Sequence, residues 1–587
     1  MALENLITEH IDIWTAALIT KSSSGRGSSK KLELYGVKKL RELILELAVR
    51  GKLVPQDPND EPASVLLERI AAEKAQLVRE KKTKKSKNLP PIIGEEPFAL
   101  PKGWEFIRWG DMAHWAIGSG FPKSAQGQRG NSILFSKVSD MNLPGNEKYI
   151  NTTANTISEE AALKIKAKLH PKGTVIFPKI GGAIATNKRR ILTRSSAMDN
   201  NCLGLIPSVG ITTDYLYLIL NSTDLVAYQA GTSVPALSQS TLELIVAALP
   251  PLSEQHRIVA KVDELMTLCD QLEQQTEASI EAHQVLVTTL LDTLTNSADA
   301  DELMQNWARI SEHFDTLFTT EESIDQLKQT ILQLAVMGKL VPQDPSDEPA
   351  AELLKRVAEE KAQLVKEKKI KKQKALPPIA EDEKPFELPS GWEWTHMDKL
   401  FYVSGGLQKT PKRTPVSNHF PYLAVANVQR GRLELDELKR FEVTPEELEQ
   451  YKLLAGDLMV VEGNGSENEI GRCAIWSEDV PDCLHQNHLI RCRPLIPSLS
   501  FWVLNVLNSP LGINTMKSLA VTSSGLYNLS VGKIRGIFLP MPPLNEQKRI
   551  VSKIKELTSI CDQLKAHLNE SQATQLHLTD TIVEQAV

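Results

Sequence analysis

Short stretches of basic, hydroxyl and amide residues recur in two regions of the sequence, residues 104–250 and 392–542. Lys and Arg bind DNA phosphates, while Arg with guanine and Asn or Gln with adenine are common pairs at base edges. We therefore interpret these stretches as candidate DNA-contacting loops, with ordinary solvated loops as the alternative. The candidate residues are Lys123, Ser124, Lys137, Lys179, Asn187, Lys188, Arg189 and Arg190 in the first region and Lys409, Thr410, Lys412, Arg413, Gln429, Arg430 and Arg432 in the second.

Catalytic motifs do not accompany these stretches. Residues 118–124 contain glycines, a lysine and a serine, but their spacing does not fit a GxxxxGK[ST] phosphate loop. HExxH, GxSxG, protein-kinase, amino-methyltransferase and cofactor-binding glycine motifs are also missing from the sequence. We predict no catalytic residue and no cofactor site in this chain. A self-sufficient nuclease or methyltransferase is a rival hypothesis, which turnover by the purified chain alone would support.

The cysteines and the chain's apolar content bound the class of protein. The six cysteines form no CxxC pair, which argues against a disulfide framework and a zinc ribbon. Cys483, His485 and His488 lack a matching second pair of metal ligands, so we predict ordinary strand and loop residues and no metal site. Neither a membrane span of about 18 apolar residues nor a secretory signal is readable, and we expect a cytoplasmic protein.

An internal duplication organises the chain. Residues 51–85 match residues 338–372 at 27 of 35 positions, with an offset of 287. A second pair, residues 250–272 and 542–564, repeats with an offset of 292. Because the two offsets are nearly equal, one unit has been duplicated. The unit consists of a helix, a charged helix, a Pro-rich joint, a variable region, a Pro-Pro joint and a long helix.

The variable regions diverge within this preserved frame. Residues 104–249 and 392–541 share only short fragments. This suggests one scaffold that carries two different recognition surfaces; drift under weak constraint is the alternative. Short β-rich runs alternate with Gly and Asn turns and with short helical patterns. We therefore predict two mixed α+β bodies.

A coiled-coil seam follows each variable region, with apolar residues stepping by threes and fours and a polar middle. Each helix could run about 40 residues, or roughly 60 Å. Two such helices from a duplicated chain pack most economically as an antiparallel coiled coil around a pseudo-two-fold axis. The predicted seam residues are Ile258, Val262, Leu265, Cys269, Leu272, Thr276, Ser279, His283, Val287, Leu290 and Leu294 in the first helix and Ile550, Ile554, Leu557, Cys561, Leu564 and Leu568 in the second.

Each charged helix ends in a run of lysines. We interpret the runs as solvated helix ends and linkers, with phosphate or partner contact as the alternative. They are Lys81, Lys82, Lys84, Lys85 and Lys87 in the first copy and Lys368, Lys369, Lys371, Lys372 and Lys374 in the second.

The formal net charge of −6 is unevenly distributed. Residues 104–250 carry 14 basic and 10 acidic side chains, a net of +4, whereas residues 392–542 carry 15 and 16, a net of −1. Acidity therefore lies mainly in the helical frame, and neither variable region has a strong basic footprint. We expect the isolated chain to bind DNA weakly, with partner chains supplying much of the phosphate contact.

The joints resemble a known family. Pro-Pro-Leu-x-Glu-Gln-x-x-Ile-Val occurs at residues 250–259 and 542–551, and Leu-Pro-x-Gly-Trp at residues 100–104 and 388–392. With the duplication and the long helices, these motifs are similar to those of the specificity subunit of Type I restriction-modification enzymes, over nearly the whole chain. The repeated Gly-Lys-Leu-Val-Pro-Gln segments resemble a longer-subunit branch of that family.

The resemblance implies a non-catalytic, DNA-binding subunit in which each variable body reads one half of a bipartite, asymmetric site. The helices would fix the spacing and dock two modification subunits, which bring S-adenosylmethionine and adenine methylation. Two restriction subunits would bring translocation and cleavage that depend on ATP and magnesium. The alternative is a coiled-coil scaffold with two protein- or carbohydrate-binding globules, which predicts no salt-dependent DNA binding.

The predicted fold class is therefore α+β, with two mixed target recognition domains separated by long antiparallel helices and related by pseudo-two-fold duplication. The expected regions are an N-terminal helical region with a basic linker at 1–103, target recognition domain 1 at 104–250, a central region with a spacer helix and the repeated helical segment at 251–391, target recognition domain 2 at 392–543, and a C-terminal spacer helix at 544–587.

Overall fold

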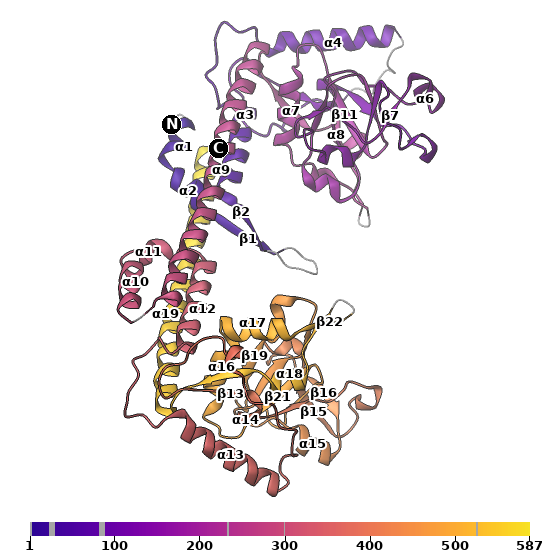
Figure 1. Cartoon of the computed structure of the whole chain (residues 1–587). Helices are drawn as coiled ribbons and strands as arrows, with labels where there is room; N and C mark the ends of the chain where they lie inside the picture. The colour runs from indigo at the N-terminus through magenta and orange to yellow at the C-terminus, as the bar shows by residue number, and fades with distance from the viewer. Residues whose placement is uncertain (1–2, 23–29, 81–88, 232–233, 299, 524–525) are drawn as a thin grey trace. The chain divides into compact units, whose positions relative to one another are not determined.

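The computed structural model describes residues 3–22, 30–80, 89–231, 234–298, 300–523 and 526–587 (Figure 1). The chain divides into two compact units. One comprises Met1–Ile19, Leu32–Glu277 and Thr574–Val587, and the other comprises Thr20–Lys31 and Ala278–Ala573. Each unit contains one body of mixed sheets and short helices together with parts of both long helices, which confirms the predicted α+β class. Below, the first body is residues 104–250 and the second body is residues 392–543.

The first body is built on three sheets, in the orders β4-β11-β8-β9-β6, β10-β5-β7 and β12-β3. Parallel pairs join β6 to β9 and β10 to β5, and the other registered pairs are antiparallel. The central strand β8 is a fully buried apolar run, as expected where both faces of a sheet are covered. The elements are β3 (Glu105–Arg108), α5 (Trp109–Met112), β4 (Ala113–Ile117), β5 (Ile133–Ser136), β6 (Tyr149–Ile150), β7 (Thr156–Ile157), α6 (Glu159–Lys164), β8 (Val175–Pro178), β9 (Arg190–Leu192), β10 (Ser196–Met198), β11 (Cys202–Pro207), α7 (Thr213–Ser222), α8 (Gln239–Leu242) and β12 (Val246–Leu249).

The second body contains sheets in the orders β14-β21-β17-β19, β16-β15-β20, β13-β24 and β18-β23-β22. Its strand β17 is again a fully buried apolar run. The elements are β13 (Glu393–His396), α14 (Met397–Leu400), β14 (Phe401–Gly405), β15 (His419–Leu423), β16 (Lys439–Glu442), α15 (Pro445–Tyr451), β17 (Leu458–Val461), β18 (Gly463–Asn464), β19 (Cys473–Ile475), β20 (Leu484–His485), β21 (Leu489–Pro494), α16 (Leu499–Asn508), α17 (Pro510–Leu519), β22 (Val521–Ser523), β23 (Leu526–Asn528), α18 (Val531–Arg535) and β24 (Phe538–Met541).

The two bodies share one topology despite their divergent sequences. The order β4-β11-β8-β9 in the first corresponds to β14-β21-β17-β19 in the second. In the smaller sheets, β5 is parallel to β10 and antiparallel to β7, as β15 is parallel to β20 and antiparallel to β16. The second body adds α17, and its sheet of β18, β22 and β23 lies where the first body has the isolated bridges Ile180–Ala236 and Ala230–Ala236. One scaffold therefore carries two different sets of loops.

The helices outside the bodies follow the duplicated sequence. The long helices contain 45 and 43 residues, close to the predicted length, and each has its glutamate in the first turn, where a negative charge suits the helix dipole. The elements are α1 (Leu3–Glu9), α2 (Ile11–Ala16), β1 (Leu18–Ser22), β2 (Lys30–Leu34), α3 (Tyr35–Val49), α4 (Ala63–Arg79), α9 (Leu252–Asn296), α10 (Ala300–Glu312), α11 (Phe314–Leu317), α12 (Glu321–Val336), α13 (Ala350–Lys366) and α19 (Leu544–Ala586).

The long helices pack through predicted seam residues in the second unit, and a further helix packs with them in each unit. In the first unit, α3 joins them: Arg41 pairs with Asp270 of α9 at 2.7 Å, and the Tyr35 hydroxyl donates to Asp580 of α19 at 2.7 Å. In the second unit, residues from the end of α9, from α12 and from the start of α19 form one core. Each unit thus holds the start of one long helix and the end of the other, as the predicted antiparallel pairing requires.

The seam is tightest at its ends. Ile258, Leu265 and Leu294 are buried, whereas Ser279 in the polar middle is exposed. Near the end of α9, Leu291 takes the buried position and Leu290 is half-buried, one residue away from the predicted step. The lysine run of the second copy is exposed after α13 ends, and the run at residues 81–87 lies outside the described residues.

The repeated joint motifs attach each body to its long helix. The Trp104 Nε1–H donates to Glu254 Oε2 at 3.0 Å, and the Gln56 amide donates to Glu254 Oε1 at 3.1 Å. The second copy repeats the contacts, with Trp392 at 3.0 Å and Gln343 at 3.2 Å from Glu546. A buried carboxylate requires such partners, so the Trp of one motif and the Glu of the other are kept together.

A glycine in each copy permits this joint. Gly51 follows α3 with φ +69°, and Gly338 follows α12 with φ +72°. A Cβ atom on Gly51 would lie 2.4 Å from the Pro101 ring, and one on Gly338 would lie 2.5 Å from the Pro389 ring. Both the backbone conformation and the close approach therefore demand glycine.

The joint predicts a pH dependence of stability. Burial raises the pKa of Glu254 and of Glu546 above the usual 4.5. Between 4.5 and the higher folded pKa, the folded state binds more protons than the unfolded state, so stability falls as pH rises through this window. We expect the melting temperature of the double variant Glu254→Gln/Glu546→Gln to fall less than that of the wild type as pH rises through this window. Thermal melts between pH 4 and 8 measure it, with Glu264→Gln/Glu556→Gln at exposed sites on the same helices as the control; equal pH profiles for the wild type and the joint variant would refute the expectation.

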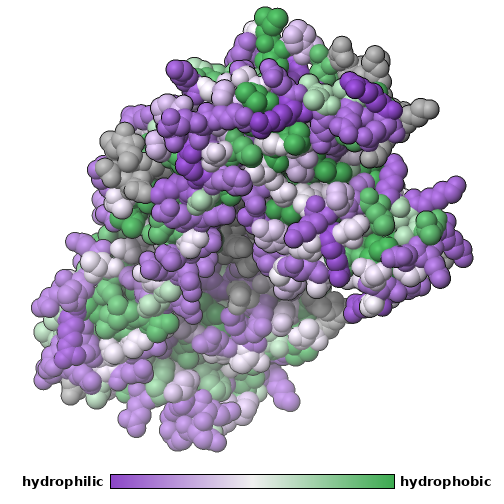
Figure 2. Space-filling model, turned by 90° about the horizontal axis from the view of Figure 1, so that it is seen from above, coloured by the Kyte–Doolittle hydropathy of each residue, from purple (hydrophilic) through white to green (hydrophobic). Residues whose placement is uncertain are grey.

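The exposed apolar residues are mostly scattered. Among the described residues, no helix combines the length and the apolar content needed to cross a membrane. On the face shown in Figure 2, hydrophobic side chains occur in small groups among hydrophilic ones.

Candidate nucleic-acid interface

Loops that connect different strands of the first body converge at one end of its sheets. The Ser119 N–H donates to the Met198 carbonyl at 2.8 Å, the Asp199 N–H donates to the Ser136 carbonyl at 2.9 Å, and the Lys179 N–H donates to the Asn201 carbonyl at 2.9 Å. These bonds tie together the loops that follow β4, β5 and β8 and the turn that precedes β11. We call residues 118–126, 136–148, 179–189, 199–201, 229–231 and 234–237 the first loop edge.

The second body repeats this convergence. The Leu407 N–H donates to the His485 carbonyl at 2.9 Å, the Gln486 N–H donates to the Leu423 carbonyl at 3.1 Å, and the Glu462 N–H donates to the His488 carbonyl at 2.9 Å. The donors and acceptors occupy positions equivalent to those in the first body. The second loop edge comprises residues 406–418, 424–438, 462–472, 486–488, 521–523 and 526–529.

A glycine lets two loops cross at each edge. A Cβ atom on Gly118 would lie 1.8 Å from the Asp199 carbonyl oxygen, and one on Gly406 would lie 2.4 Å from the Gln486 carbonyl oxygen. No side chain fits at either position. The crossing therefore belongs to the shared scaffold, and the side chains around it are left to differ.

The loop edges contain nearly all the residues that the sequence singled out. In the first body, Lys123 is exposed in a short 3-10 turn, and Lys179 is half-buried just after β8. The backbone of Ser124 lies in the same turn as Lys123, and its side chain is outside the described set. Lys137 donates to Gln126 Oε1 at 2.9 Å and lies 5.0 Å from the centre of the Phe121 ring.

The segment 187–190 is mostly occupied by contacts within the protein. Arg189 is 1% exposed and donates to the carbonyls of Leu220 and Lys188 and to Asn187 Oδ1. Burial lowers the pKa of Arg189 to about 10. Arg190, in β9, donates to the carbonyls of Arg189 and Met141. These two guanidinium groups hold the loop, which carries Asn187, exposed at φ +49°, and Lys188, bonded to Asn142.

The second loop edge also has both exposed cations and cations that are paired within the protein. Lys409 and Lys412 are exposed, and Thr410 precedes the 3-10 turn Pro411–Arg413, where its carbonyl accepts the Arg413 N–H. Arg413 makes a two-bonded pair with Glu447, at 2.8 and 3.1 Å. Hydrogen bonding from Arg413 lowers the pKa of Glu447, so the pair stays charged at neutral pH.

The 425–432 loop is held by a residue that the sequence reasoning missed. Arg472 donates to Gln429 Oε1 at 2.8 Å and to Glu469 at 2.9 Å. Arg430 is largely buried, which lowers the pKa of its guanidinium. Arg432 is exposed beside Glu434 at 3.1 Å. Arg472 follows a Gly-rich turn and precedes β19, and only its tertiary contacts reveal its role.

A small basic cavity of about 390 Å³ lies at the start of the second loop edge. The sequence reasoning named Lys409, Thr410 and Arg413 from its wall but missed Lys439 and Arg440 of β16. Register explains their proximity, because Tyr422 pairs with Lys439 and Pro421 pairs with Arg440. The adjacent Lys-Arg pair in the sequence was the available signal. Arg413 is paired with Glu447, and the other three cations, Lys409, Lys439 and Arg440, suit an anionic group such as a phosphate.

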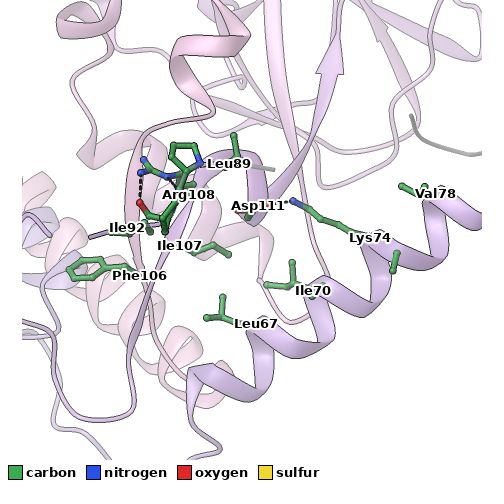
Figure 3. A pocket seen from close by; sticks show the side chains of 14 residues that line it. Leu67, Ile70, Lys74, Val78, Leu89, Ile92, Phe106, Ile107, Arg108 and Asp111 are labelled. Carbon is green, nitrogen blue, oxygen red and sulfur yellow. Dashed lines mark hydrogen bonds and ion pairs between the residues drawn. The ribbon is translucent and has the colours of Figure 1, made fainter. Parts of the chain in front are cut away.

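A larger cavity, of about 720 Å³, lies between α4 and β3 (Figure 3). Its wall is mostly apolar, including Leu67, Ile70 and Ile107. Lys74 at its rim is paired with Asp111 at 2.8 Å, and Arg108 donates to backbone carbonyls and to Glu95. Because its charged groups are paired and the hollow is apolar, we do not count it with the loop edges.

Two of the three residues in the Cys-His cluster, Cys483 and His485, belong to the core of the second body, whereas His488 is exposed. Cys483 and His485 are both buried beside β20, where burial raises the pKa of the Cys483 thiol to about 12 and lowers the pKa of His485 to about 3. His485 is therefore neutral. No group of three His, Cys, Asp or Glu side chains suited to a metal ion occurs among the described residues.

Comparisons with known proteins point in one direction. A family model described as "Type I restriction modification DNA specificity domain" matches residues 101–282. The Type I restriction enzyme EcoAI and EcoEI specificity subunits of Escherichia coli are each 42% identical to the chain, and both alignments cover 100% of both sequences. The crystal structure of the HsdS subunit from Thermoanaerobacter tengcongensis aligns with a TM-score of 0.41 at 18% identity, over 84% of this chain and 98% of that one.

Proposed function

Because the chain belongs to the specificity-subunit family of Type I restriction-modification enzymes, we propose that each of its two bodies reads one half of a bipartite, asymmetric DNA target. The chain is the DNA target-specificity subunit of such a system and a non-catalytic component of it. The observation that carries the proposal is the pair of loop edges, which have the same backbone frame and different side chains. The scaffold alternative, with protein- or carbohydrate-binding globules, is set aside by the full-length relatives.

Equivalent positions of the two edges differ in charge, which supports different half-sites. The residue after the central strand is Lys179 in the first body and Glu462 in the second, and both are half-buried. Lys donates to guanine O6 and N7, whereas Glu accepts from cytosine N4. A duplicated chain presents its two readers in inverted orientation, as symmetric dimers do on palindromes. Different readers then require different halves. We assign residues 104–250 and 392–543 as the two target recognition domains.

We assign the exposed cations of the edges to contacts with DNA phosphates. We assign the cations that are paired within the protein to holding the loops in position. Lys123, Lys409 and Lys412 have the exposure that phosphate contact needs. Arg189 and Arg413 are committed to carbonyl and carboxylate partners and would position the loops around them. Phosphate contacts fix register and orientation and carry no sequence information.

Salt dependence tests this assignment. In a complex with the modification subunits, we expect Lys409→Ala/Lys412→Ala to weaken binding about equally on all DNA sequences. The slope of log affinity against log salt should fall by about 0.9 for each phosphate that no longer meets a lysine, or about 2 in total. A filter-binding series between 50 and 300 mM salt measures the slope. The matched control is Lys355→Ala/Lys366→Ala, which removes two exposed lysines of α13 in the helical frame. An unchanged slope for the loop variant would remove Lys409 and Lys412 from the interface.

The helical frame is assigned to spacing and to partner docking. Large apolar side chains are exposed along it, with Val285 62%, Leu286 49% and Met304 72% exposed. Exposed apolar residues on a rigid helix suit a protein partner. We place two modification subunits, which would bind S-adenosylmethionine, on this frame. Two restriction subunits, with ATP and magnesium, would complete a cytoplasmic complex that modifies or cuts DNA.

A further inference from the structure

Each loop edge includes a hairpin that the two bodies share. In the first, the Leu237 N–H donates to the Lys179 carbonyl at 2.9 Å; in the second, the Leu529 N–H donates to the Glu462 carbonyl at 2.7 Å. Both leucines are buried, and a capping serine that starts the next short helix follows each of them. These bonds place the described residues of the two hairpins, 229–231 with 234–237 and 521–523 with 526–529, at equivalent positions.

One aliphatic side chain is exposed at the same position of both hairpins. Val234 is 59% exposed and Leu526 is 48% exposed. Each lies three residues before the buried leucine that anchors the hairpin, Leu237 in the first body and Leu529 in the second. The two bodies diverge in sequence elsewhere on the edges, yet an aliphatic residue occurs here in both. Exposed apolar residues are ordinary, and Ile180, Val416 and Val521 are also exposed on the edges, but an aliphatic residue at the same distance from the anchoring leucine in both bodies indicates a contact.

Backbone pairing flanks Val234 and includes Leu526. In the first hairpin, Ala230 and Ala236 exchange two hydrogen bonds of 2.9 Å, and the Gly181 N–H donates to the Pro235 carbonyl at 2.7 Å. In the second, β23 pairs with β22 on one side and with β18 on the other. Paired backbone limits the entropy that an apolar tip would lose on contact.

We propose that Val234 and Leu526 each make the apolar contact of their body with the bases of its half-site; this inference rests on the proposed function. Two base surfaces offer the chemistry, the methyl group of thymine and the face of an unstacked base step. DNA is the occupant because the hairpins are bonded directly to Lys179 and Glu462, at the centre of the candidate interface. A bound modification subunit is the competing occupant, and the experiment below separates the two.

The test uses the full complex with modification subunits and duplex oligonucleotides that carry the native target, identified by mapping methylated adenines. We expect Val234→Ser to lower affinity roughly tenfold and to relax discrimination among bases in the first half alone. Leu526→Ser should do the same in the second half. The controls are Val209→Ser and Leu454→Ser, which change aliphatic residues that are 45% and 41% exposed and lie outside the loop edges.

Two further measurements identify the base surface. Replacing thymine by uracil should reproduce the loss of affinity if a methyl group is contacted. If a base step is opened, 2-aminopurine fluorescence should rise with the wild type and stay low with Val234→Ser. Weaker assembly with the modification subunits, or behaviour equal to the controls, would overturn the inference. If the wild-type complex modifies no bipartite site, the proposed function fails instead.

Discussion

A chain whose residues 104–250 are replaced by the corresponding residues of a relative with another target is expected to modify a site that differs from the native one in a single half. The joint makes the exchange possible, because Trp104 and Glu254 meet at its boundary and both copies of the chain use the same contact. The second half and the gap should not change, because the second body and the long helices are retained.

Sequencing of methylated adenines in a host that carries the chimeric complex measures this result. The reciprocal replacement of residues 392–543 is the matched control, and it should change only the other half. One contact between the body and α9, the Gln255 amide oxygen with the Thr212 N–H at 2.9 Å, uses a backbone atom of the body and so does not depend on the side chain that the relative carries there. Recognition altered in both halves by one exchange would contradict the modular assignment.

Shortening both long helices by seven residues is expected to shorten the unread gap by about three base pairs. Seven helical residues rise about 10 Å, and base pairs are stacked about 3.4 Å apart. Removal of residues 274–280 from α9 and 570–576 from α19 cuts each helix in its polar middle, where Ser279 is exposed. A heptad keeps the seam residues on the same face.

Methylation mapping again supplies the readout for the shortened chain. A variant with alanine at all of these positions controls for the removal of the side chains and should keep the native gap. A shortened complex that still modifies the native gap would show that the helices do not set the spacing.

Most of the fold could be predicted from the apolar periodicity and the internal repeats of the sequence. The apolar steps from Ile258 to Leu294 predicted the long helix, and repeated joints located the bodies. Near the end of α9, Leu291 is buried where the sequence predicted Leu290, because α9 packs there against α12 and α19. A local sequence pattern contains no information about that packing. Strand order in the bodies was also beyond the sequence, because it depends on pairings between distant strands such as β4 and β11.

The sequence could predict which segments form the candidate interface, but not which of their side chains are paired within the protein. Runs of basic and amide residues predicted segments that the structure brings together at the loop edges, since loops at sheet ends tolerate such residues. Which cations are free depends on tertiary partners: Glu447 pairs with Arg413, and backbone carbonyls hold Arg189. Lys439 and Arg472 were missed because each reaches the edge through pairing with a distant segment.

The most direct test of the account places the first body at both positions of the chain, with residues 104–250 repeated in place of 392–543. Two identical readers in inverted orientation should modify a palindromic bipartite site, made of the first native half and its inverted copy. Methylated-adenine mapping in a host with this complex gives the answer. A modified site that stays asymmetric, or that repeats the half in direct orientation, would contradict the claim that each body reads one half of the target.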